Sequence, residues 1–136
     1  MNENIYVHKS SYLRVRRFFV LNKFEGAVNN NEYVRRVQRG YMAKSMEVEK
    51  FLNMIIETLS KEFEKEVKLE EMGEGQIRIV IDSYEVRTSM SYLEEIKSPY
   101  GIDRFILESL EKEGFIFDRN RSQYIQYCFG IYNGMK

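Results

Sequence analysis

The amino-acid sequence predicts a single α+β domain in which a mostly antiparallel sheet packs against helices on one side. Two patterns indicate this class: apolar residues at helical spacing over 46–66, and period-two alternation over 76–82 and 84–89. The 136 residues are 43% hydrophobic and 31% charged with one proline, which is typical of one globular domain. We expect residues 1–30 to form a basic N-terminal arm or strand, and residues 31–136 to form the α+β domain.

The first third of the chain predicts a strand followed by a helix. Residues 11–24 are rich in aromatic and β-branched side chains and partly alternate in polarity, which favours a strand or an ordered arm. Asn31 then has the side chain of a helix N-cap. In this helix Val34, Val37 and Tyr41 share one face, and the arginines lie largely off it.

The segment 46–66 is the clearest helix in the sequence. Its apolar residues recur every three or four positions and draw one broad stripe, which consists of Val48, Phe51, Leu52, Ile55, Ile56, Leu59 and Phe63. We expect this stripe to face the core of the domain. The alternative is that it forms the seam of a homodimer.

Three strands are predicted after this helix, over 67–72, 76–82 and 84–89. Gly73-Glu74-Gly75 is typical of a hairpin turn, and Ile77, Ile79 and Ile81 would share one face of the second strand. The segment therefore predicts three strands of the mostly antiparallel sheet.

The last third predicts two helices and a final hairpin. Ser91 begins a capping-box pattern for a short helix, and Ser98 is the expected cap of a second helix with proline at its first position. Gly114 would end that helix. The aromatic and β-branched segments 115–117 and 123–132 then predict a β-hairpin.

Charge is distributed unevenly along the chain. Residues 1–44 hold nine Lys or Arg against three acids, a net charge of +6, whereas the remaining 92 residues carry a net charge of −6. Such a basic segment favours an anionic partner, or packs against the acidic body of its own domain. Arginine forks suit phosphate, and neighbouring aromatic rings can stack on bases. The candidate partner-binding residues are Tyr12, Arg14, Arg16, Arg17, Arg35, Arg36, Arg39, Tyr41 and Lys44.

The sequence offers no pattern for a metal site, a cofactor or a nucleophile. His8 and Cys128 are its only histidine and cysteine, whereas zinc sites need three or four such ligands at close spacing. Cys128 lies in an aromatic segment and is expected to be a buried core thiol. A single cysteine, no apolar run long enough to span a bilayer, and no signal-peptide pattern predict a cytoplasmic location without a membrane partner.

The order of predicted elements from residue 46 onward has one further interpretation. A helix, three strands, a helix and a strand is similar to the order found in restriction-like nucleases. That resemblance implies a divalent metal held by an Asp on one strand and by a Glu-x-Lys motif on the next. Here Asp82 ends a strand, but the next strand carries Glu85-Val86-Arg87, and Glu95-Ile96-Lys97 falls in a predicted helix.

The sequence therefore predicts a small non-enzymatic binding or regulatory protein that engages a nucleic acid or nucleoprotein through a basic N-terminal surface. Its short length and its high content of Lys, Glu, Asn and Ile are compatible with a bacterial, phage or mobile-element protein. Inhibition of host nucleic-acid machinery, such as a CRISPR nuclease, is one example of that role. A metal-dependent nuclease of restriction-like order and a homodimeric interaction protein are the alternatives.

Overall fold

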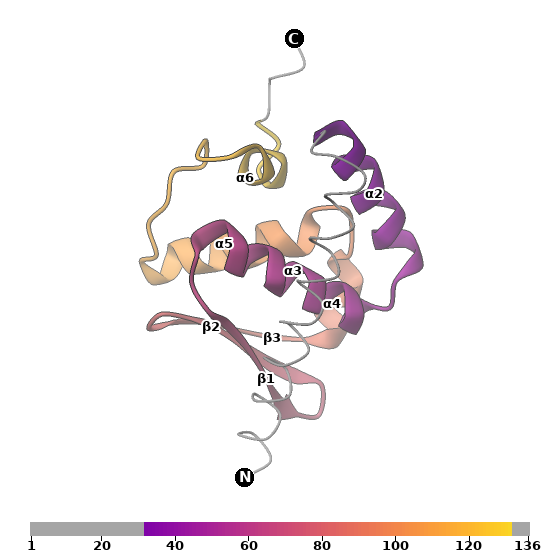
Figure 1. Ribbon diagram of the computed structural model, residues 1–136. Helices are drawn as coiled ribbons and strands as arrows, with labels where there is room; N and C mark the ends of the chain where they lie inside the picture. Colours follow the sequence, from indigo (N-terminus) through magenta and orange to yellow (C-terminus); the bar gives the residue numbers. More distant parts are fainter. Residues whose placement is uncertain (1–31, 132–136) are drawn as a thin grey trace.

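Helices cover one face of a small sheet in the computed structural model, which describes residues 32–131 (Figure 1). The elements are α2 (Glu32–Ser45), α3 (Val48–Phe63), β1 (Val67–Gly73), β2 (Gln76–Ile81), β3 (Tyr84–Ser89), α4 (Met90–Ile96), α5 (Gly101–Glu113) and α6 (Gln123–Cys128). The strands form an antiparallel sheet in the order β1-β2-β3. This confirms the α+β class, whereas the predicted arm over 1–30 lies outside the described residues.

The three predicted strands are confirmed, together with the turns that join them. The β1–β2 turn places Gly73, Glu74 and Gly75 at positive φ, a conformation that glycine adopts without steric cost. The register aligns Leu69 with Ile79 of β2, and Ile79 in turn with Val86 of β3. Because side chains alternate between the faces of a sheet, this register gathers the apolar residues on one face. That face forms the floor of the core.

The apolar stripe of α3 packs on this floor. Its central members, Phe51, Leu52, Ile55, Ile56 and Leu59, are all at most 2% exposed. The helix ends at Phe63 because the next residue takes the left-handed conformation, where its N–H bonds back to a carbonyl one turn earlier. The expected core-facing stripe is therefore confirmed. Since the chain's own core uses this stripe, it does not form an exposed homodimer seam.

The caps of α4 and α5 differ from the prediction. Ser89, not Ser91, caps α4, and its hydroxyl oxygen accepts a hydrogen bond from the N–H of Tyr92. The helix α5 begins at Gly101 instead of at the predicted proline after Ser98. A Cβ atom at position 101 would clash with the carbonyl oxygen of Ile96, so only glycine fits this tight turn. Gly114 ends α5 with φ at 106°, as expected.

The predicted C-terminal hairpin is wrong, because residues 123–128 form α6. Ser122 caps this helix, and its hydroxyl oxygen accepts a hydrogen bond from the N–H of Ile125. Ile125, Cys128 and Phe129 are buried at helical spacing, so burial on one helix face outweighs the strand propensity of the aromatic residues. The helix lies on the side of α5 that faces away from the sheet (Figure 1).

Candidate nucleic-acid interface

A buried ion pair anchors α2 to the rest of the domain. Arg39, only 6% exposed, extends from α2 toward Asp103 of α5, which is fully buried. Two parallel hydrogen bonds join them, at 2.8 Å from Nη1 to Oδ1 and 2.9 Å from Nη2 to Oδ2. The same Nη1 donates to the carbonyl oxygen of Pro99 at 2.6 Å. This bidentate geometry is the strongest that an arginine and a carboxylate can form, and it fixes the orientation of the helix.

Aromatic rings surround this ion pair. The guanidinium of Arg39 lies 4.8 Å from the ring centroid of Tyr100, 5.5 Å from that of Phe51 and 5.8 Å from that of Tyr124. The hydroxyl of Tyr124 also donates a short hydrogen bond to Oδ2 of Asp103. These five residues, which we call the Arg39 cluster, link α2, α3, α5 and α6. A buried charge is tolerated only when it is paired and hydrogen-bonded in this way.

Burial and charge raise the pKa values of three groups in and beside the Arg39 cluster, which are Arg39, Tyr124 and Cys128, and so favour their protonated forms. Burial alone would lower the pKa of Arg39, but the negative charge of Asp103 raises it on balance, so the guanidinium stays charged. Burial raises the pKa of Tyr124 well above its ordinary value, and the charge of Asp103 raises it further. Burial likewise raises the pKa of the Cys128 thiol. A buried, protonated thiol is a poor nucleophile, in agreement with the predicted core role of Cys128.

The exposed residues of α2 include two large hydrophobic side chains and two cations. Tyr41 is 72% exposed and Val37 is 55% exposed, among the highest fractions for large hydrophobic residues in the described part of the chain. Lys44 is exposed at the end of the helix, and Arg36 is exposed where its guanidinium lies 5.1 Å from the ring centroid of Tyr127. We call these four exposed residues, Arg36, Val37, Tyr41 and Lys44, the α2 face. By helical spacing Val37, Tyr41 and Lys44 point away from Arg39, and Arg36 lies at the edge beside α6.

The predicted partner-binding residues thus divide into three groups. Tyr12, Arg14, Arg16 and Arg17 lie outside the described residues. On α2, Arg36, Tyr41 and Lys44 are exposed and Arg35 is half-buried, so this part of the prediction retains its surface. Arg39 does not lie on that surface, because its guanidinium neutralises Asp103 inside the domain.

Sequence reasoning missed the role of Asp103, although one signal pointed to it. The residue lies inside the apolar stripe of its helix, directly after Ile102 and three positions before Ile106, both of which are buried. An acid at such a position needs a buried cation. The sequence could not say which of the chain's arginines supplies it.

The residues of the nuclease alternative lie at the other side of the molecule, in ion pairs. Asp82 contacts Lys65 at 3.2 Å. Glu85 accepts from Arg87 at 2.9 Å and contacts Arg78 at 3.3 Å, and the hydrogen bond from Arg87 lowers the pKa of its carboxyl. The described residues contain no group of three or more His, Cys, Asp or Glu side chains placed to hold a metal ion.

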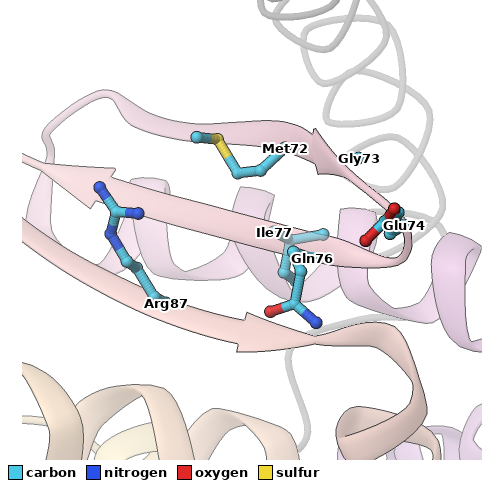
Figure 2. Close-up of a pocket in the computed structure, with 6 residues that line it drawn as sticks. All are labelled: Met72, Gly73, Glu74, Gln76, Ile77 and Arg87. Carbon is cyan, nitrogen blue, oxygen red and sulfur yellow. The ribbon is translucent and has the colours of Figure 1, made fainter.

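A shallow hollow lies at the end of the sheet formed by the β1–β2 turn, and Arg87 is the one residue of these pairs that lines it. Its volume is about 500 Å³. Figure 2 shows Arg87 of β3 on one side, Met72 of β1 on another, and Glu74 at the turn. The lining mixes both charges with apolar atoms, and so it does not select an anionic ligand.

Comparisons with protein-family models, curated proteins and solved structures found no match to this chain. No helix within residues 32–131 is long and apolar enough to cross a membrane.

Proposed function

We propose that the protein is a non-enzymatic binding module that engages a nucleic acid or a nucleoprotein through the α2 face and the basic segment 1–44. The observation that carries this proposal is the exposure of Tyr41 and Val37 beside the cations Arg36 and Lys44. An exposed ring offers a stacking platform for a base, and the neighbouring cations offer contacts for phosphates. The Arg39 cluster supports this function by fixing the helix from behind.

Charge along the chain supports the same partner. The segment that ends with α2 carries a net charge of +6, and the rest of the chain carries −6. A polyanion that touches the α2 face meets cations, while the acidic part repels it from other faces. A nucleoprotein, which offers both phosphates and basic protein surface, would complement both parts.

The biological role that fits this activity is regulation by occupancy. A protein that covers a nucleic-acid site or its reader would block host machinery such as a CRISPR nuclease without any chemistry of its own. We propose the cytoplasm as its compartment, since its single cysteine offers no intrachain disulfide. The metal-dependent nuclease remains the alternative, with Asp82 and Glu85 as the residues to test.

The test is a titration of labelled single- and double-stranded DNA and RNA at low and moderate salt, with and without Mg²⁺, on a gel that also reports cleavage. We expect shifted, uncut nucleic acid that salt releases, because phosphate contacts displace counterions. Cleavage that is lost on Asp82→Ala would instead establish the nuclease. No shift at low salt would contradict direct nucleic-acid binding.

A pair of matched variants assigns the binding to the α2 face. Arg36→Ala with Lys44→Ala removes two of its cations, and Lys68→Ala with Lys112→Ala removes two exposed cations from β1 and from the end of α5. Loss of two phosphate contacts should reduce the slope of log K against log salt by about 1.4 for a single strand. Equal effects of both pairs would show that net charge, not the α2 face, governs binding.

A further inference from the structure

The end of α6 lies between arginines from different elements. On one side Arg36 of α2 covers the ring of Tyr127. On the other, the ring of Phe129 has the guanidinium of Arg119 at 4.0 Å from its centroid and that of Arg104 of α5 at 5.7 Å. Because the two rings are two residues apart, the α2 face and this second pair of arginines border the same short helix.

Both Arg104 and Arg119 are exposed, and the ring of Phe129 contacts the guanidinium group of each. Their side chains are 50% and 44% exposed. Each also contacts a carboxylate, Glu108 at 3.0 Å for Arg104 and Glu111 at 2.8 Å for Arg119. Such exposed ion pairs are weak, so a phosphate can replace the carboxylate while the ring contact persists.

The net charge of the segment around α6 is positive, whereas that of the segment around β1 is negative. Residues 118–131, which include α6, hold two arginines against one acid, Asp118. Residues 66–74, which include β1 and its turn, hold one lysine against four glutamates. The uneven charge along the sequence is thus also present in three dimensions. Arg119 and Arg121 come from the acidic part of the sequence but lie at the basic end of the molecule.

We propose that Arg104 and Arg119 extend the α2 face, so that a single-stranded nucleic acid runs from α2 across the end of α6 to α5. This inference rests on the proposed function and names its substrate class. Tyr41 is 72% exposed and offers its ring to an unpaired base, whereas the bases of a duplex are already stacked on each other. The arginines around α6 then contact the following phosphates.

The experiment compares two variants of the full chain with the wild type, using labelled oligo-dT as the probe and a duplex as competitor. The test variant is Arg104→Gln with Arg119→Gln. The matched control is Arg78→Gln with Arg87→Gln, which also removes two glutamate-paired arginines but lies on the sheet. Circular dichroism establishes that both variants are folded.

We expect the test variant to bind oligo-dT about tenfold more weakly at low salt, with a salt slope reduced by about 1.4, and the control to bind like the wild type. Wild-type binding that the test variant retains would overturn this inference and leave the proposed function intact. Equal losses in both variants, or tighter binding of the duplex, would also overturn it. Failure of the wild type to bind any nucleic acid would overturn both proposals.

Discussion

The sheet side of the molecule and its α2–α6 end are held together by different kinds of interaction. On the sheet side, α3 is fixed by hydrocarbon side chains such as Ile55 and Leu59, which share one core with the isoleucines of β2. At the other end, α2 is fixed by the charge of Arg39 together with Met42 and Ala43, which pack on the core from the same helix face, whereas Val37 and Tyr41 are exposed. A helix can therefore dock through a face that mixes apolar residues with a cation when a buried acid requires one.

The largest loss of stability is expected when the Arg39–Asp103 ion pair is broken by removing the carboxylate. Asp103→Ala leaves the guanidinium of Arg39 buried without a counter-charge, and we expect the free energy of unfolding to fall by about 3–5 kcal/mol. Denaturant unfolding at neutral pH measures this change. The double variant Arg39→Met with Asp103→Leu should recover most of the loss, because it removes both charges. A cost below about 1 kcal/mol for Asp103→Ala would contradict the anchoring role of the pair.

A comparable loss is expected on the sheet side, but from a different cause. Ile55→Ala removes methyl groups from a fully buried position and leaves a cavity, which lowers the free energy of unfolding by about 2–5 kcal/mol. Ile116→Ala is the control, since that side chain is 91% exposed and should change stability by less than about 0.5 kcal/mol. Similar values for the two variants would refute the assignment of α3 to the core.

Alkaline pH should weaken the α2–α6 end specifically. The pKa values of Cys128 and Tyr124 are raised in the folded protein, chiefly by burial, so the unfolded chain loses these protons first. Stability is therefore fully present below the ordinary thiol pKa of about 8.5 and falls as pH rises, by about 1.4 kcal/mol per unit for each group.

Cys128→Ala separates the two groups. In this variant the decline should begin only near the ordinary phenol pKa of about 10, as measured by urea unfolding across the pH range. Identical pH profiles for variant and wild type would show that the thiol does not contribute.

The sequence predicted the parts of the fold that depend on local pattern. The strands β1–β3 and the stripe of α3 follow from period-two and helical spacing alone. The predicted start of α5 was wrong because the tight turn before this helix brings the backbone of Gly101 close to Ser98 and to the carbonyl of Ile96, where no Cβ fits. For α6, strand propensity was misleading because burial against α5 favoured the helix.

The candidate site was only partly predictable, for a related reason. The basic and aromatic character of their segment predicted Arg36 and Tyr41 as contact residues, and both are exposed. The burial of Arg39 depends on Asp103, which lies 64 positions away, and no local pattern connects the two. The contacts of Arg104 and Arg119 with the ring of Phe129 could not be predicted, because they depend on residues 123–128 forming a helix.

The most direct measurement places a tryptophan on the α2 face, since the chain has none of its own. In Tyr41→Trp the indole should be readily quenched by acrylamide in the free protein and protected when oligo-dT is added. The matched variant Tyr92→Trp carries its probe on α4, at a position that is 40% exposed, and should show no protection. An indole at position 41 that is buried in the free protein, or that oligo-dT leaves unprotected, would contradict the account.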